Sequence, residues 1–361
     1  MLRLNRVKGE RGAVAIIVAI LATALIGFAA IGVDVANMAS DKQQLQNGAD
    51  AVALAIAQDC SADTTNCTDN NPVLLETTLE GAPPKLAIEN KNDGQARVDS
   101  VKFSGAVGNE VTVTVSDETE HWFAGIFEKN ESTISARGTA GWGKMSGHAG
   151  LPLVLSLGYM ECVASGGWNN VDDDESPFED PDGDGIYTLR NPTDPPTTVQ
   201  LVEAQFTQPT GNPKEGDLVG GCELDGNWIP GGFGWIDPDG TGCEAITAIG
   251  SEESSKPGAP PPQPDCKVID LAEYVGKTLP VAVFENPPSG TGSPASYIIA
   301  GYVAFHITGY NMPGQWTEPQ PTCDKCLEGY FDKFPAGEGS YTSGGPDWGS
   351  YVVRLILGPS S

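Results

Sequence analysis

The feature that most constrains this chain is an uncharged, mostly apolar run near its N-terminus, from Gly12 to Val33. As a helix rising about 1.5 Å per residue, the run would extend about 33 Å, enough to cross a hydrocarbon core of about 30 Å. A secretory signal peptide has an apolar core of only about 7–15 residues, followed by a cleavage site between small residues. Ala22-Thr23-Ala24 has the form of such a site, but it lies in the middle of the run. The length therefore favours a permanent membrane anchor over a cleaved signal peptide.

The charges on either side of the run predict its orientation. Four basic residues precede it (Arg3, Arg6, Lys8 and Arg11), and Asp34 follows it. Because basic residues favour the cytoplasmic side, we expect a single span with a cytoplasmic N-terminus and the rest of the chain outside. The whole chain carries a net charge of −28, which would repel nucleic acid and anionic lipid headgroups and favours solubility.

The cysteine content agrees with an extracellular location. All eight cysteines follow the apolar run, and an even number in an exported, loop-rich chain favours disulfide bonds. Only Cys60–Cys67, which closes a short local loop, is predicted as a pair. Cys323 and Cys326 have a C-x-x-C spacing that also fits a redox pair or half of a zinc site, but no βαβ context or nearby histidine pair supports either. The disulfide candidates are Cys60, Cys67, Cys162, Cys222, Cys243, Cys266, Cys323 and Cys326.

The apolar run is predicted to continue without a break into an amphipathic helix. Between Asp34 and Asp59, apolar residues recur at helical spacings and Gly48 is the only helix breaker, and no proline occurs before Pro72. We therefore expect one rod from Ala13 to Gln58, roughly 70 Å long at about 1.5 Å per residue. The apolar positions of the second part are Val35, Met38, Leu45, Ala49, Val52 and Ile56.

A family resemblance is carried by three stretches of the N-terminal part: ERGAVAIIVAI (Glu10–Ile20), GFAAIGVDVANM (Gly27–Met38) and QLQNGADAVALAIAQDC (Gln44–Cys60). They resemble the TadG-like family of the tight-adherence (Flp) pilus assembly system. The resemblance implies a membrane helix that continues into a pilin-like stalk under a β-rich head. Three later stretches look like those of actinobacterial members: Gly231–Cys243, Tyr297–Tyr310 and Cys326–Phe331.

The sequence departs from the prepilins of this system at one point. Prepilins carry a glycine followed five residues later by a glutamate, and a prepilin peptidase cuts after the glycine. Here Ile17 lies five residues after Gly12, and Val14 lies five residues after Gly9. The departure indicates a retained anchor and argues against a major pilin that polymerises in bulk.

The residues after the stalk change to the period-two alternation that is typical of strands. Between the second and third expected strands, we predict a short helix at His121–Asn130 whose aromatic side chains pack into the head. The expected strands of the first head are 96–105, 109–119 and 132–143, and the aromatic residues are Trp122, Phe123 and Phe127.

Together these patterns predict an α+β fold with a β-rich, disulfide-containing extracellular head. The expected divisions are a basic cytoplasmic N-terminus (1–12), a transmembrane helix (13–35), a stalk helix (36–59), a pilin-like α+β head (60–145) and a β-rich extracellular domain with long loops (146–361).

One acidic stretch is a candidate metal site. Asp180, Asp182 and Asp184 precede a glycine in the D-x-D-x-D-G arrangement of a calcium loop, and Ile186 would offer its carbonyl. Asn191 stands at the twelfth position in place of a bidentate glutamate, and the flanks are not helical, which excludes an EF-hand. Two interpretations stay open: a non-helical loop that binds Ca²⁺, or a solvated acidic loop rich in turn residues.

The sequence contains none of the catalytic motifs G-x-S-x-G, H-E-x-x-H and G-x-x-x-x-G-K-[ST], so we expect a non-catalytic protein. Two functions compete. The first is a membrane-anchored structural or assembly component of a tight-adherence pilus or related secretion machinery. The second is a cell-surface adhesin or binding protein stabilised by calcium. The Gln44–Cys60 segment favours the first, and the expected partners are the lipid bilayer and other pilus-assembly or pseudopilin subunits.

Overall fold

The structure is a computed structural model of the chain. It describes residues 11–62, 67–75, 83–105, 109–124, 130–157, 233–239, 242–256, 266–285, 296–313, 326–337 and 346–356, with shorter pieces at 178–179, 188–189, 218–219, 222–223, 261, 315–317, 319–320 and 339–342.

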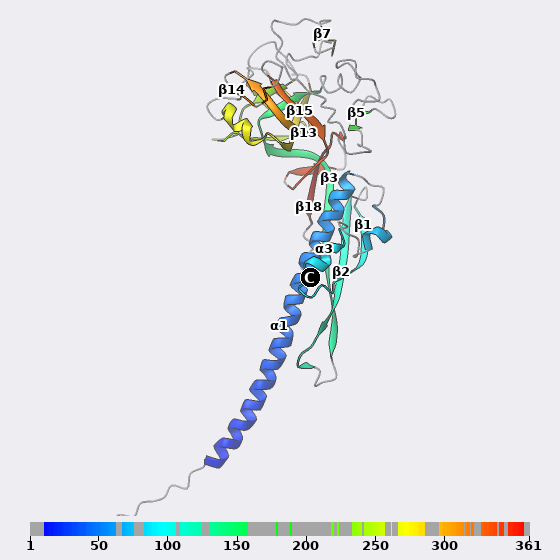
Figure 1. Ribbon diagram of the computed structural model, residues 1–361, viewed down its shortest axis with the longest axis vertical. Coiled ribbons are helices and arrows are strands. Elements are labelled where there is room, and N and C mark those ends of the chain that lie inside the picture. The colour runs from blue at the N-terminus through cyan, green and yellow to red at the C-terminus, as the bar shows by residue number, and fades with distance from the viewer. Residues whose placement is uncertain are drawn as a thin grey trace, which may run out of the picture.

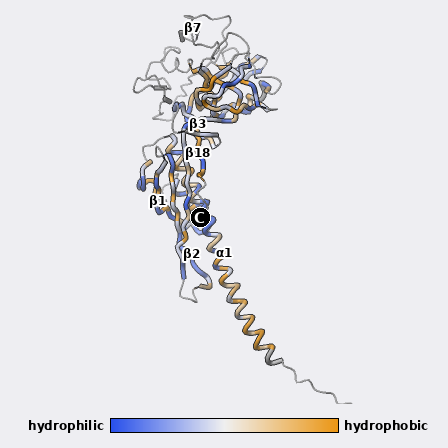
Figure 2. Tube along the Cα trace, turned by 180° about the vertical axis from the view of Figure 1, so that it is seen from behind, coloured by the Kyte–Doolittle hydropathy of each residue, from blue (hydrophilic) through white to orange (hydrophobic). Residues whose placement is uncertain are grey.

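Helix α1 (Arg11–Ala62) is continuous over 52 residues and runs from outside the head into its core (Figure 1). At about 1.5 Å per residue, it is roughly 78 Å long. Its first part projects alone and is strongly apolar, whereas the part from Asp34 onward lies against the head (Figure 2). The predicted continuous helix is confirmed. Gly48 lies where Ala87 of the neighbouring segment comes close to the helix, because a Cβ added at Gly48 would lie only 3.2 Å from the Cα of Ala87.

A proximal sheet packs against the second part of α1. Its strands follow the order β1–β2–β3–β18–β16, and β10 and β17 also pair with β3. β16 is parallel to β18, and the other pairs are antiparallel. The predicted strands of the first head correspond to β1, β2 and part of β3. The bounds are β1 (Arg97–Ser104), β2 (Glu110–Glu120), β3 (Glu131–Gly150), β10 (Ala245–Ala248), β16 (Phe334–Ala336), β17 (Ser340–Thr342) and β18 (Ser350–Leu355).

The proximal core fills the space between α1 and this sheet. Small and branched side chains of the helix meet alternate residues of β1, β2 and β3, as expected for a helix laid on one face of a sheet. Its fully buried members include Ala49, Val52, Ala53, Ile56, Val101, Val111, Val113, Val115 and Ala140.

A distal sheet forms the far lobe of the molecule (Figure 1). Its order is β11–β9–β4–β12–β13–β14, with β15 also paired to β13 and β12 parallel to β4. Large apolar side chains fill its core, among them Leu153, Trp235 and Phe305. The bounds are β4 (Leu153–Ser156), β9 (Phe233–Ile236), β11 (Glu252–Lys256), β12 (Lys277–Glu285), β13 (Ser296–Met312), β14 (Gln315–Trp316) and β15 (Cys326–Asp332).

Short elements complete the described part of the chain. They are α2 (Pro72–Leu75), α3 (Lys85–Glu89), the 3₁₀ helix η3 (Val268–Glu273), and the two-stranded pairs β5 (Phe178–Glu179) with β6 (Thr188–Leu189) and β7 (Leu218–Val219) with β8 (Cys222–Glu223).

Two strands join the lobes. β3 runs from the lower end of the proximal sheet up to the distal lobe, so residue 145, where the sequence suggests a division, lies inside a strand. β18 returns near the end of the chain and pairs with β3 from Ala140 to Lys144. Its Val353 lies in the proximal core, and its Val352 belongs to a third apolar cluster with Met145 and Phe284. The fold is α+β, as predicted.

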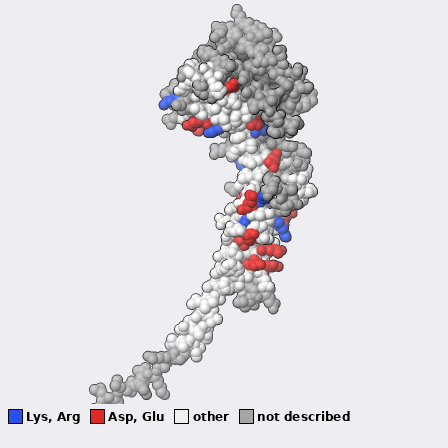
Figure 3. All heavy atoms as spheres, viewed as in Figure 1, with Lys and Arg blue, Asp and Glu red and all other residues white. Residues whose placement is uncertain are grey.

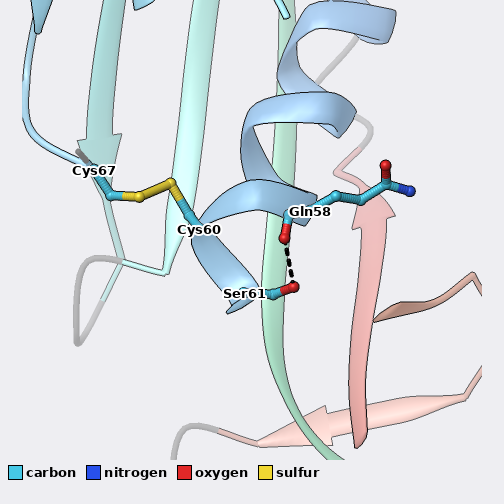
Figure 4. The surroundings of a disulfide bond; sticks show 4 residues. All are labelled: Gln58, Cys60, Ser61 and Cys67. Carbon is cyan, nitrogen blue, oxygen red and sulfur yellow. Dashed lines mark hydrogen bonds between the residues drawn. A yellow bond between two sulfur atoms is a disulfide. The ribbon is translucent and has the colours of Figure 1, made fainter. Parts of the chain in front are cut away.

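Disulfide bonds lie in both lobes. Cys60, in the last turn of α1, is bonded to Cys67, the pair expected from the short loop (Figure 4). The Ser61 hydroxyl donates a hydrogen bond of 2.8 Å to the Gln58 carbonyl in the same turn. In the distal lobe, Cys243 is bonded to Cys266, a pair that the sequence does not reveal.

Candidate functional site

The first part of α1 is an uncovered apolar surface. No charged side chain occurs between residues 14 and 33, and the large apolar side chains there are exposed, up to 73% for Phe28 and 69% for Ile26. The most apolar window of the helix has a mean hydropathy of 2.8, and none of it is buried. By length and composition, this part of α1 could cross a membrane. A continuous apolar surface of this size calls for a lipid or protein partner.

The apolar part ends at a carboxylate that is bound by the head. Asp34 is buried and accepts hydrogen bonds from three consecutive backbone N–H groups, those of Trp122 (2.9 Å), Phe123 (3.1 Å) and Ala124 (2.7 Å). The three donors, residues 122–124, lie just after β2 at the lower end of the β2–β3 hairpin, which reaches down along α1 (Figure 1), and these three residues are called the hairpin tip below. Hydrogen bonds to an ionised acceptor are strong, so this contact fixes the hairpin tip to the helix.

A buried ion cluster joins α1 to the sheet above this point. The Lys91 side chain is 1% exposed, and its Nζ lies 3.1 Å from Asp41, 2.6 Å from Asp93 and 2.9 Å from Asp117. The Thr119 hydroxyl also donates to Asp41, over 2.8 Å. Burial acts to lower the pKa of Lys91, but its hydrogen bonds to the three carboxylates outweigh this and raise it above its ordinary value. The cation therefore stays charged, and the cluster ties α1, the turn after α3 and β2 together.

Further contacts hold α1 against β3. The Lys42 ammonium donates to the Ser135 carbonyl, and the Gln46 amide donates to the Arg137 carbonyl over 2.7 Å. One turn further along α1, at Ala49, the helix backbone approaches that of Gly138 in β3. The approach is so close that a Cβ added at Gly138 would lie 2.5 Å from the carbonyl of Ala49. The second part of α1 is thus an integral part of the head.

A polar groove of about 450 Å³ lies between α1, β2 and the turn after α3. Two of its carboxylates, Asp41 and Asp93, are already paired with Lys91. Within the described ranges, no group of three or more histidine, cysteine or acidic side chains is arranged to hold a metal ion. The lining residues are Asn37, Ser40, Asp41, Gln44, Asn92, Asp93, Gln95, Glu118, Thr119, Glu120 and Trp122.

The candidate calcium ligands Asp180, Asp182, Asp184 and Ile186 lie outside the described residues. So do Cys162 and Cys323. Cys222 lies in β8, and Cys326 is disulfide-bonded at the start of β15.

His306 has a structural role in β13. Its Nδ1 lies 2.9 Å from the Thr278 hydroxyl, and its ring stacks on Tyr330 with the centroids 4.6 Å apart.

The structure corrects one expectation from the sequence and shows contacts of Asp34 and Asp41 that the sequence pattern does not predict. The sequence predicts that Trp122, Phe123 and Phe127 pack into the head, but Trp122 and Phe123 are 73% and 40% exposed, and Phe127 lies outside the described residues. The importance of Asp34 and Asp41 is not apparent from the apolar pattern alone. A signal was nevertheless present, because the two lie seven residues apart and Asp41 precedes the buried Leu45 by four, which places all three on one helical face.

Comparison with known proteins places the N-terminal part in context. Residues 12–59 match the family described as "Putative Flp pilus-assembly TadE/G-like", so the match covers the apolar part of α1 and nearly all of the packed part. Neither the curated proteins nor the solved structures gave a match for this chain. The match supports a relation to pilus assembly for the segment that contains Asp34, Asp41 and the buried face of α1.

Proposed function

We propose that this chain is a membrane-anchored, non-catalytic structural or assembly component of a tight-adherence (Flp-type) pilus or a related secretion machinery. Its N-terminus is cytoplasmic and its two lobes are extracellular. The observation that carries the proposal is the family match over 12–59, which coincides with a helix that is bare and apolar in its first part and built into a head in its second. The three later stretches that look like actinobacterial members support assignment to that subclass.

The organisation of α1 fits such a role. An apolar helix that projects from a head can rest in the bilayer or pack beside the helices of other pilus subunits without any change in the head. Because Asp34, Lys91 and Gly138 fix the head to the same helix, the position of the helix sets the position of both lobes.

The role is tested by deleting the gene and restoring it in two forms in cells that assemble the pilus. One form is the complete chain, and the other has residues 1–33 replaced by a cleavable secretory signal. We expect pili on the cell surface only with the complete chain. Normal pili in the deletion strain, together with loss of binding to a surface, would contradict the proposal and favour the adhesin.

The orientation is tested in intact cells with a membrane-impermeant thiol reagent. Thr133→Cys, at an exposed position on β3, should be labelled, whereas Asn5→Cys should react only after the cells are broken. Labelling of Asn5→Cys in intact cells would show that the chain is inverted. Recovery of a mature chain that begins after Val33 would show that the apolar run is a cleaved signal.

A further inference from the structure

The tip of the β2–β3 hairpin presents an aromatic surface that the head leaves uncovered. Trp122 is 73% exposed, as exposed as Phe28 in the apolar part of α1, and the neighbouring Phe123 is 40% exposed. On a soluble head, a side chain as large as Trp122 usually buries much of its surface. The two rings therefore lack the cover that the core gives to the other aromatic residues of the proximal lobe, such as Trp142.

The position of the tip along α1 is fixed by the Asp34 contacts. The Trp122 N–H lies 2.9 Å from one carboxylate oxygen of Asp34, and the Ala124 N–H lies 2.7 Å from the other. Asp34 directly follows Val33, the last residue of the apolar part. If the apolar part spans a bilayer, the end of the span and the backbone of Trp122 and Phe123 lie at nearly the same depth, and the two exposed rings lie within a side-chain length of it.

We propose that the hairpin tip is a second membrane contact, in which Trp122 and Phe123 enter the headgroup layer of the leaflet from which α1 emerges. The proposal rests on the membrane anchoring proposed above. Tryptophan is enriched at this depth because its ring is amphipathic, with an apolar body and an N–H that can meet water or headgroups. The aromatic surface thus binds lipid, and the anchor helix holds this surface at the depth of the headgroups.

The charges around the tip limit how deep it goes. Glu118 and Glu120, at the end of β2, and Glu131, at the start of β3, are exposed just above the tip. Figure 3 shows acidic side chains gathered over this lower part of the head, beside a projecting helix that has none. Carboxylates stay in water and are repelled by anionic headgroups. We therefore expect the rings to enter the interface and the strands to stay above it, most favourably in a zwitterionic membrane.

Two points of contact constrain the head more than one does. A single helix leaves rotation about its axis and tilt of the head free, whereas a second contact at the same leaflet restricts both. Because Asp34 holds the tip beside the helix, this contact needs no rearrangement of the head.

The test uses the full chain reconstituted at low density in phosphatidylcholine vesicles, with tryptophan fluorescence as the readout. Some vesicles carry a nitroxide near the lipid headgroup, and others carry it near the end of the acyl chain. We expect the shallow nitroxide to quench the wild-type chain and most of this quenching to be lost in Trp122→Phe. Trp316→Phe is the matched control, because Trp316 is also well exposed, at 46%, but lies in β14 of the distal lobe. It should leave the lipid quenching unchanged.

Flotation of the same vesicles on a density gradient separates this proposal from the anchor itself. A chain that floats but shows equal quenching before and after Trp122→Phe overturns the membrane contact and leaves the anchor intact. A Trp122 signal that responds only to a higher density of the chain, and not to nitroxide lipids, overturns it in favour of a contact between subunits. A chain that does not float overturns both proposals.

Discussion

Lys91 is the residue on which the junction between α1 and the sheet depends. It is the common partner of Asp41, Asp93 and Asp117, and two of these carboxylates are themselves largely buried. Removing one partner of a buried ion pair destabilises a protein by more than the intact pair stabilises it, because the remaining charges stay desolvated.

We therefore expect Lys91→Met to lower the free energy of unfolding by about 3 kcal/mol. Lys85→Met is the control, because the ion pair between Lys85 and Glu89 is long, at 4.0 Å, and partly exposed, and its loss should change stability by less than about 0.5 kcal/mol. Urea denaturation of both variants in detergent gives the comparison. Equal, small effects would show that the cluster is not a stabilising junction.

A second residue-scale prediction concerns alkaline pH. Burial raises the pKa of Tyr302 to about 12, although its hydroxyl is hydrogen-bonded to Thr247. An unfolded tyrosine ionises near pH 10, so the folded state loses stability as the pH rises from about 10 towards 12, by up to about 1.4 kcal/mol per pH unit for this group. Tyr302→Phe should make the unfolding midpoint fall less steeply over this range. The same slope in both chains would assign the loss to other groups.

The acidic loop predicts a calcium effect. If Asp180, Asp182 and Asp184 bind Ca²⁺ with the weak affinity of extracellular modules, with a dissociation constant of about 10⁻⁴–10⁻³ M, millimolar Ca²⁺ should raise the melting temperature modestly. The double variant Asp182→Asn with Asp184→Asn should lose this rise. An equal rise in the double variant would show general screening of the net negative charge, and no rise in the wild type would favour the solvated loop.

At the scale of elements, local sequence patterns correctly predicted the helix and strands that form from local spacing. The long helix followed from helical spacing and the absence of proline, and β1 and β2 followed from alternation. Of the helix expected at 121–130, the structure describes Trp122 and Phe123, which are exposed and not packed into the head, whereas Phe127 lies outside the described residues. The sequence could not show that Asp34 would hold the tip with Trp122 and Phe123 outward, because that contact joins residues nearly ninety positions apart.

α1 and β3 approach each other closely at Gly138. An added Cβ would lie within 2.6 Å of the backbone of Ala49 and Asp50, which no side-chain rotation can relieve. We expect Gly138→Ala to destabilise the chain by about 1–3 kcal/mol through overpacking. Gly242→Ala is the control, since an added Cβ there has no neighbour within 4 Å. Thermal unfolding of the two variants decides, and a neutral Gly138→Ala would show that the helix can lift from the sheet.

At the scale of the whole molecule, the lobes share their last strand. β18 pairs with β3, and its Val352 and Val353 enter two different cores. The apolar residues of β18 are typical of a buried strand, but its partner β3 lies about two hundred residues earlier in the chain. Alternation predicts which face of a strand is buried and not which strand it joins, so the return of the chain to β3 could not be read from the sequence.

A chain that ends at residue 349 therefore lacks a strand of the proximal sheet. We expect a lower unfolding midpoint, and aggregation through the exposed edge of β3, when it is compared with a chain that ends at residue 356 and keeps β18. Size-exclusion chromatography with thermal unfolding measures both. Identical behaviour of the two chains would show that β18 contributes nothing to the proximal lobe.

The parallel course of α1 and β3 has a mechanical consequence. Both run from the hairpin tip towards the distal lobe, and the helix leaves the head at its lower end while the strand leaves at its upper end (Figure 1). A load between the anchor and the distal lobe would thus pull the two elements past each other along their length. Such a load would act in shear on the Asp34 contacts, the Lys91 cluster and the close contact at Gly138. It would also act on the eleven residue pairs of β2 and β3. All of these contacts would be loaded together, and they would not be peeled apart one at a time. Since inter-strand hydrogen bonds lie across the strand direction, a load along the strands acts on many of them at once.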